Sequence, residues 1–216
     1  VRQWNLSDGA QVAEWRAHDD TVHALALTRD GRRLATGGDD TVAKIWEVKT
    51  RKEWARFEAH HGPVYGLAFN GDGAQLATAG GDGDLLIWDL KSRQKLTEIR
   101  VHKGGVTGVS WSPDDKTLAT SCEDGLARMF TEIKSHDGAQ RSSTARERKL
   151  TGGEGRLHAV AMSSDAKLVA AAGQNGAVYL WRNNKLAATL ELEAAETPKV
   201  SRGFVRDVLP ILSKAG

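Results

Sequence analysis

A histidine, a threonine and an aspartate occur together three times along the chain, and each aspartate is followed by an aromatic residue. A hydroxyl, an imidazole and a carboxylate in fixed relation are the parts of a nucleophilic hydrolase, in which the imidazole takes the hydroxyl proton and the carboxylate orients the imidazole. The spacing is the same in every set. The sets are His18, Thr36, Asp40 and Trp46; His60, Thr78, Asp82 and Trp88; and His102, Thr120, Asp124 and Phe130.

Repetition of the sets argues against catalysis. An enzyme needs one preorganised group in one cleft, whereas a structural hydrogen-bond network is formed again in every repeat that buries the same polar groups. We therefore predict that the sets are structural and that the chain is not an enzyme. Phe130 lacks the indole N–H of tryptophan, which shortens the third network. A fourth, weaker copy carries Gly153, Ala171 and Asn175 instead, which predicts a sheet held mainly by apolar packing.

Other reactive groups give little sign of chemistry. The single cysteine, Cys122, cannot form an internal disulfide, and its place in a turn where other copies carry glycine favours a structural role over a reactive thiol. The histidines of the sets lie in separate repeats, and no Cys-x-x-Cys or His-x-x-x-His spacing gathers metal ligands. The sequence therefore predicts no metal site and no cofactor.

The composition is that of a turn-rich globular protein, with 40% hydrophobic residues, 27% charged residues and 23 glycines among 216. Thirty basic and 28 acidic residues give a net charge of +2, so no field of one sign points to nucleic acid or an anionic membrane. No apolar run approaches the roughly 20 residues that a membrane helix needs. We expect neither nucleic-acid binding nor membrane insertion.

The sets belong to a longer repeat. LATGGDDTVAKIW at 34–46, LATAGGDGDLLIW at 76–88 and LATSCEDGLARMF at 118–130 match one another, and VAAAGQNGAVYLW at 169–181 is weaker. Four short strands with tight turns fit one repeat, and the Gly- and Asp-rich segments suit hairpins. One such sheet cannot bury both of its faces, so neighbouring copies must stack.

With these motifs the chain resembles WD-repeat β-propellers over about residues 1–190. AH precedes the first strand of a repeat, DG follows it, and LAT lies in the second strand, although only IWD at 87–89 keeps the Trp-Asp ending. The resemblance implies an all-β propeller of four complete four-stranded blades plus half a blade, in an open or partial ring. Such a half blade favours a fragment whose preceding blades are missing. We expect a propeller segment at 1–193, with blades at about 18–57, 60–99, 102–151 and 153–192.

The resemblance also assigns roles to residues. In the family, the recurrent histidine, threonine, aspartate and tryptophan form a hydrogen-bonded network within each blade. Partners bind mainly where the connections before the first strand and between the second and third strands meet. This implies a noncatalytic scaffold for protein–protein interaction, with ordinary surface variation as the alternative reading of each position. The positions that would contact a protein or peptide are His23, Tyr65, Thr107 and His158; Asp39, Gly81, Glu123 and Gln174; and Arg156.

One internal segment departs from the repeat. KSHDGAQRSSTARERKLTGGEG at 134–155 contains nine additional residues and is predicted to be a long loop that leads into the third copy's last strand. Its cluster of Arg141, Arg146, Arg148 and Lys149 could bind an acidic partner or could simply be solvated.

The last residues depart from it too, and 194–216 are expected to be a linker and the start of a possible second module. They resemble the lead-in of bacterial cytochrome c-type modules, with an amphipathic linker or short helix as the alternative. If that resemblance holds, the chain is the propeller part of an exported or periplasmic bacterial haem or redox protein whose haem module is absent; otherwise a cytoplasmic location is expected. The matching residues are Phe204, Asp207, Val208, Pro210, Ile211 and Leu212.

Overall fold

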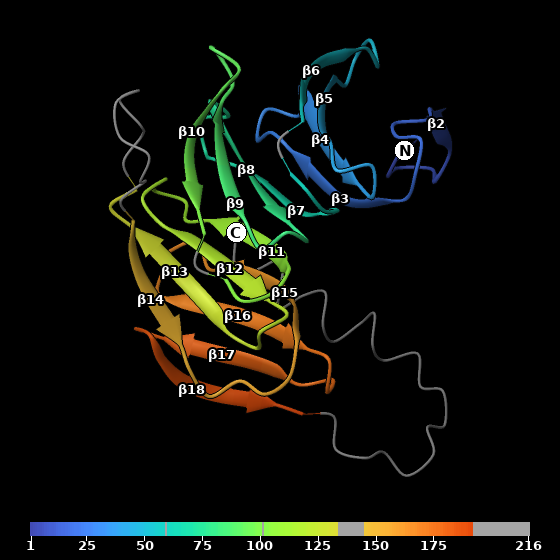
Figure 1. Ribbon diagram of the computed structural model, residues 1–216. Helices are drawn as coiled ribbons and strands as arrows, with labels where there is room; N and C mark the ends of the chain where they lie inside the picture. Colours follow the sequence, from blue (N-terminus) through green and yellow to red (C-terminus); the bar gives the residue numbers. More distant parts are fainter. Residues whose placement is uncertain (59, 101, 134–144, 192–216) are drawn as a thin grey trace.

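The computed structural model describes residues 1–58, 60–100, 102–133 and 145–191, and every regular element in these ranges is a β-strand (Figure 1). The first two strands, β1 (Arg2–Trp4) and β2 (Gln11–Glu14), form a two-stranded sheet.

Sixteen further strands form four antiparallel sheets, called sheets 1 to 4 in chain order. Sheet 1 contains β3 (Val22–Leu27), β4 (Arg33–Gly38), β5 (Ala43–Glu47) and β6 (Glu53–Phe57). Sheet 2 contains β7 (Val64–Phe69), β8 (Gln75–Gly80), β9 (Leu85–Asp89) and β10 (Gln94–Ile99). Sheet 3 contains β11 (Val106–Trp111), β12 (Leu118–Cys122), β13 (Ala127–Thr131) and β14 (Arg146–Leu150). Sheet 4 contains β15 (Leu157–Met162), β16 (Leu168–Gly173), β17 (Val178–Arg182) and β18 (Lys185–Leu190).

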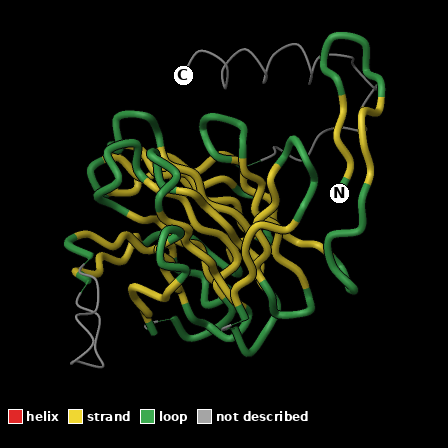
Figure 2. Tube along the Cα trace, turned by 90° about the horizontal axis from the view of Figure 1, so that it is seen from above, coloured by secondary structure: helices red, strands yellow, loops and turns green. Residues whose placement is uncertain are grey.

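The four sheets follow one another along an open arc (Figures 1 and 2). Their first strands lie side by side, because β3 contacts β7, β7 contacts β11, and β11 contacts β15. Within each sheet, consecutive strands are hydrogen-bonded neighbours in chain order. The structure therefore confirms the predicted all-β architecture of four four-stranded blades preceded by a two-stranded piece.

The hairpin between the first two strands of each sheet requires a left-handed backbone at one position. Gly31 and Gly73 supply it in sheets 1 and 2, with φ of 68° and 69°. Asp115 and Ala166 occupy the same place in sheets 3 and 4, with φ of 58° and 56°. Aspartate tolerates this conformation, whereas alanine pays about 1–2 kcal/mol for it. The turn is thus fixed by the fold even where the residue disfavours it.

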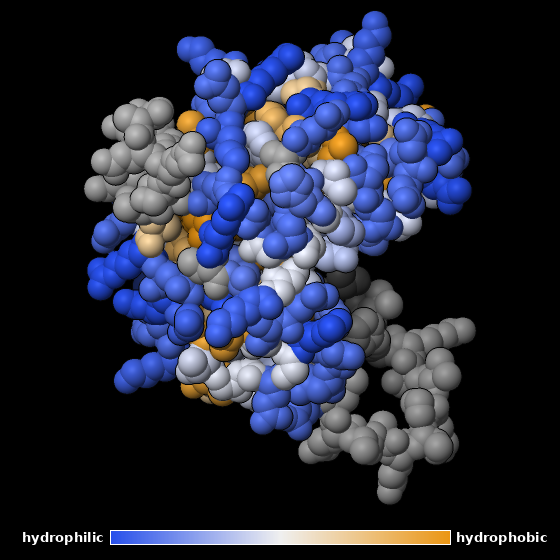
Figure 3. Space-filling view, viewed as in Figure 1, coloured by the Kyte–Doolittle hydropathy of each residue, from blue (hydrophilic) through white to orange (hydrophobic). Residues whose placement is uncertain are grey.

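Apolar side chains fill the spaces between successive sheets. Between sheets 1 and 2, Ile45 packs in one cluster with Leu76 and Trp88. The next space contains Ile87 and Phe130 in the same relation. Sheets 2 and 3 therefore each contribute one face to the core before them and the other face to the core after them. On the surface seen in Figure 3, hydrophobic residues show only as small patches among larger hydrophilic areas.

The face of sheet 1 that points away from sheet 2 has fewer neighbours. Leu25 and Leu67 occupy equivalent positions, since each lies opposite the threonine of its own set in the next strand. Leu67 is 8% exposed between sheets 1 and 2, while Leu25 is 59% exposed. Trp46 on the same face is covered by Trp15, whose ring centroid is 6.3 Å away. Among the described residues, cover over this face is therefore partial.

These two leucines make a matched test of stacking. We expect Leu67→Ala to lower the free energy of unfolding by about 2–5 kcal/mol, because it opens a cavity between two sheets. Leu25→Ala should cost less than about 1 kcal/mol, because its side chain is already exposed to water. Urea denaturation of both variants measures the difference, and equal losses would contradict the stacking account.

Candidate functional site

The recurrent polar residues of sheet 2 form a continuous hydrogen-bonded chain. His60 Nε2 lies 2.7 Å from Thr78 Oγ1, and His60 Nδ1 lies 3.1 Å from both carboxylate oxygens of Asp82. The indole N–H of Trp88 donates to the same threonine oxygen at 3.1 Å. The carboxylate also accepts the backbone N–H of His61, which fixes the turn before β7. The chain thus joins that turn to the second and third strands.

Sheet 1 repeats this arrangement. His18 Nε2 lies 2.6 Å from Thr36 Oγ1, and His18 Nδ1 lies 2.8 Å from both oxygens of Asp40. Trp46 donates its indole N–H to Thr36 Oγ1 at 2.9 Å. The distances are those of a hydrolase triad, but Thr36 is 0% exposed. Its oxygen already serves both neighbours, so a substrate carbonyl cannot reach it.

A glycine makes room for the histidine–aspartate pair. A Cβ atom at Gly80 would lie 2.2 Å from His60 Nδ1 and 2.3 Å from Asp82 Oδ1, which is far inside van der Waals contact. Gly38 holds the same position at the end of β4. In sheet 3 this position is Cys122. A side chain therefore stands at the position where, in sheet 2, the histidine–aspartate pair leaves no room for a Cβ atom.

Sheet 3 accordingly forms a different network. His102 Nε2 lies 3.0 Å from Thr120 Oγ1, but His102 Nδ1 is buried without a hydrogen-bond partner among the described residues. Asp124 instead accepts from the guanidinium of Arg128, whose side chain is 2% exposed and whose Nε donates to Glu147 at 3.0 Å. The prediction of one network through His102, Thr120 and Asp124 is therefore wrong at the histidine–aspartate step.

Cys122 and Arg128 together account for this change. The thiol lies 3.4 Å from the Gly104 carbonyl oxygen, and the backbone N–H of Asp124 points at the sulfur at the same distance. Arg128 then holds the carboxylate from the position that Leu86 occupies in sheet 2. The prediction that Cys122 lies in a turn is also wrong, because it ends β12 and is fully buried.

The electrostatics of sheet 3 follow from this burial. Desolvation, followed by the positive charge of Arg128, lowers the pKa of His102 to about 4. Burial alone would raise the pKa of Asp124, but hydrogen bonds from Arg128 and from two backbone N–H groups hold it well below its usual range. Burial raises the pKa of the Cys122 thiol to about 11. At neutral pH the imidazole is uncharged and the thiol stays protonated, so neither is an activated nucleophile.

Sheet 4 replaces the set with other polar groups. The hydroxyl of Tyr179 accepts from the Asn175 side-chain amide at 2.8 Å and donates to the Glu154 carbonyl at 3.3 Å. Trp181 donates its indole N–H to the Thr151 carbonyl at 2.8 Å. Sheet 4 was expected to rely mainly on apolar packing, and these hydrogen bonds add to the apolar cluster that it shares with sheet 3. Tyr179 is a buried polar residue in the third strand, at the position that Arg128 occupies in sheet 3. A polar residue at this repeated position was the sequence signal that could have revealed the Tyr179 network.

Four of the residues expected to contact a partner lie in the same structural feature of their sheets. Each first strand has a register shift with one unpaired residue near its beginning, which is the geometry of a β-bulge. A bulge re-aims its side chain away from the regular alternation of the strand. The four residues within these shifts are His23, Tyr65, Thr107 and His158.

The second series lies in the turns between the second and third strands. Each of its backbone N–H groups donates to a carbonyl just before the first strand of the same sheet, over 2.7–2.9 Å. This repeated bond holds the turn beside the bulge. We call these residues, the bulge residues and Arg156 the recognition face. The turn residues are Asp39, Gly81, Glu123 and Gln174.

Neighbouring members of the recognition face contact each other. His23 Nε2 lies 2.7 Å from Asp39 Oδ1, and its ring packs edge-on against Tyr65 of the next sheet at 5.3 Å between centroids. Arg156 of sheet 4 forms an ion pair with Glu123 of sheet 3 at 3.6 Å. Residue types alone gave no sign of these links, because they depend on how adjacent sheets are placed.

Other members link sheets through the backbone or stand apart. The hydroxyl of Thr107 donates to the Leu157 carbonyl of sheet 4 at 2.7 Å and lies 2.9 Å from Ser121 Oγ. His158 and Gln174 are exposed. The proposed cytochrome-like residues, from Phe204 to Leu212, lie outside the described residues, as does Arg141. Within the described part, no three His, Cys, Asp or Glu side chains gather as a metal site would require, and no helix is long and apolar enough to span a membrane.

The shared threonine yields a comparison between sheets. Thr78→Ala leaves His60 Nε2 and Trp88 Nε1 without partners, so it should lower the free energy of unfolding by about 2–5 kcal/mol. Thr120→Ala orphans only His102, because Phe130 has no N–H, and should cost about 1–3 kcal/mol. Chemical denaturation of both variants measures the gap. A larger loss for Thr120→Ala would refute this account of the network.

The pKa of His102 predicts an acid-sensitive stability. The folded pKa of His102, about 4, lies below the unfolded value, so the folded state binds fewer protons than the unfolded state between these two pKa values. The free energy of unfolding should therefore fall by up to about 3 kcal/mol as the pH falls from about 6.5 to 4. Cys122→Gly with Arg128→Leu copies sheet 2 and should let Asp124 reach the imidazole, which raises this pKa and reduces the loss. Histidine titration by NMR measures it, and an unchanged His102 pKa would show that these two residues do not cause the break.

Comparison with known proteins agrees with this geometry. The family described as WD domain, G-beta repeat matches residues 9–47, 51–89, 93–131 and 145–182, which is most of the chain. Each matched range contains the last strand of one sheet, or β2, followed by the first three strands of the next sheet.

Individual relatives match over about one repeat. An uncharacterized WD repeat-containing protein of Schizosaccharomyces pombe is 31% identical over 49 residues, which are 23% of this chain and 12% of that protein. Human angio-associated migratory cell protein is 36% identical over 50 residues, with the same two shares. Ribosome biogenesis protein erb1 of Botryotinia fuckeliana is 46% identical over 39 residues, or 18% of this chain and 5% of that protein.

The aligned part thus spans about an eighth or less of the length of these relatives. They are eukaryotic proteins and give no support to a bacterial origin or a haem-protein context. The family match rests on four repeats that cover the sheets described above, and the chain belongs to the WD-repeat family.

Proposed function

We propose that residues 1–193 act as a noncatalytic scaffold that binds a protein or peptide on the recognition face. WD-repeat proteins are generally noncatalytic and commonly serve as platforms for protein interaction. The proposal for this chain depends on its own geometry, because the aligned segments cover only a small part of each relative.

The observation that carries the proposal is the bulge that recurs in all four first strands. The bulge is present in every sheet, yet the residue within it differs: histidine in sheets 1 and 4, tyrosine in sheet 2 and threonine in sheet 3. The constant backbone geometry serves the fold, while the side chains that vary within it are available to contact a partner. The first strands of successive sheets contact one another, and His23 packs against Tyr65 of the next sheet.

The chemistry of the face suits a polypeptide. His23 and Tyr65 offer aromatic surfaces with polar ends, which can pack on a side chain and hydrogen-bond at the same time. Asp39 lies at sheet 1, and the Glu123–Arg156 pair lies between sheets 3 and 4, so both signs of charge are present. A face of mixed charge fits a peptide better than a uniformly charged polymer.

The absence of catalysis is supported by the state of the candidate nucleophiles. Thr36, Thr78 and Thr120 are each 0% exposed. Each hydroxyl is held by a histidine of its own set. Because no substrate can reach these hydroxyls, we assign them a structural role in the hydrogen-bond networks.

A binding experiment with matched variants tests the proposal. Tyr65→Ser combined with Arg156→Glu alters the recognition face, while Arg32→Glu alters an exposed turn at the opposite end of β3. Proteins captured on immobilised wild-type chain are compared quantitatively with those captured by each variant, and the best candidate is purified for calorimetry. We expect the face variant to weaken binding about tenfold or more, a loss of at least about 1.4 kcal/mol, and the turn variant to bind normally.

As a control, thermal denaturation tests whether both variants are folded, and it should give similar midpoints for both. If the purified partner binds the face variant as tightly as wild type, or loses affinity only for Arg32→Glu, the recognition face is not the binding site.

A further inference from the structure

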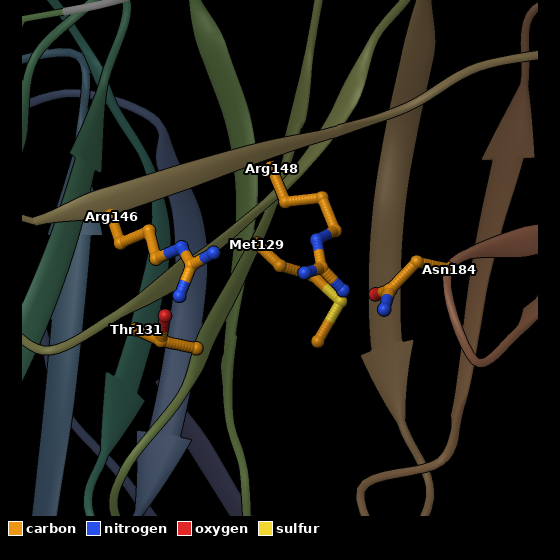
Figure 4. Close-up of a pocket in the computed structure, with 5 residues that line it drawn as sticks. All are labelled: Met129, Thr131, Arg146, Arg148 and Asn184. Atoms are coloured by element: carbon orange, nitrogen blue, oxygen red, sulfur yellow. The ribbon is translucent and has the colours of Figure 1, made fainter.

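A pocket of about 210 Å³ opens between sheets 3 and 4, at the ends of the strands opposite to the recognition face (Figure 4). Met129 and Thr131 come from β13, and Arg146 and Arg148 come from β14. Asn184, in the turn between β17 and β18, forms the facing wall. The recognition face contributes none of these residues.

Comparison of the repeats shows that the pocket replaces packed core. Arg148 lies directly across from Met129 in the sheet. The same cross-strand pair is Ile45 with Ala55 in sheet 1, and Ala55 is only 5% exposed in the core between sheets. In sheet 2 the position of Arg148 is held by Thr97, which is 2% exposed. Sheets 1 and 2 thus hold a small, buried side chain at this position, whereas sheet 3 holds an arginine.

The pocket is electropositive. Thr131 lies across from Arg146, so the two guanidinium groups share one face of sheet 3 with a hydroxyl and a thioether. Figure 4 shows the Arg146 guanidinium directed toward Thr131 and that of Arg148 directed toward the Asn184 amide. No carboxylate of the described residues lines the pocket.

Nearby acidic groups neutralise these charges only in part. Arg146 forms an ion pair with Glu132 at 3.7 Å, but both side chains are 68% exposed, so water screens the pair. Arg148 forms no ion pair with any described residue. At least one guanidinium is thus available to an incoming anion.

We infer that this pocket binds a phosphate group, either free or esterified to a side chain of a peptide. The planar fork of a guanidinium matches two phosphate oxygens, and two forks with a hydroxyl and an amide supply donors around a tetrahedral anion. The Met129 side chain offers an apolar contact for the carbon to which an esterified phosphate is attached. The inference is independent of the proposed function, because it concerns a different surface.

NMR titration of the intact chain tests the inference. The probes are inorganic phosphate, a short phosphothreonine peptide and the same peptide without phosphate, observed through the arginine Nε–Hε signals. We expect saturable shifts at Arg146 and Arg148 with either phosphate-bearing probe and none with the unmodified peptide. Tighter binding of the phosphopeptide identifies an esterified ligand, and equal or tighter binding of inorganic phosphate identifies a free one.

Variants taken from the repeats themselves control the test. Arg148→Thr copies Thr97 and should keep the thermal midpoint while it weakens phosphate binding about tenfold or more. Arg32→Ala removes an equal charge from an exposed turn of sheet 1 and should leave binding within about twofold of wild type, since general charge effects are screened in salt. Shifts that do not saturate, or equal losses in the two variants, would show nonspecific charge attraction and overturn the inference.

Discussion

The packing of each sheet's apolar face against the opposite face of the next sheet is the interaction on which the structure depends. Ile45 and Trp88 meet across the first such contact, and Ile87 and Phe130 meet across the second. In this stack the first strand of each sheet lies beside the first strand of the next. The bulges of neighbouring first strands therefore lie near one another, and contacts such as the one between His23 and Tyr65 join them across the sheets.

The polar networks are less constant than this packing. Sheets 1 and 2 share the histidine–aspartate pair, sheet 3 exchanges it for a buried arginine, and sheet 4 uses a tyrosine. Strand pairing within the sheets is nevertheless the same in all four. The fold requires that buried polar groups near the turn be satisfied, and it accepts several ways to satisfy them. His102 Nδ1 is an exception, since it has no hydrogen-bond partner among the described residues.

Sequence periodicity was sufficient to predict the sheets, because the spacing of turns and apolar residues repeats with them. The residues that occupy the bulges were chosen through the family resemblance, which assigns contact positions by their place in each repeat, and the bulges themselves were not predicted. Sequence periodicity failed at Asp124, where two neighbours outside the set, Cys122 and Arg128, decide which partner the carboxylate takes. It likewise gave no sign of the Glu123–Arg156 pair, because a contact between repeats depends on their spatial arrangement.

The offset between repeat and sheet described above has a consequence for how such chains change in length. Because a matched repeat begins with the outermost strand of one sheet and ends with the third strand of the next, adding or deleting one whole unit leaves every interior sheet with four strands. The number of open hydrogen-bonding edges at the two ends stays the same. Gene duplication can therefore lengthen or shorten the arc by single units without creating a half-built sheet within it.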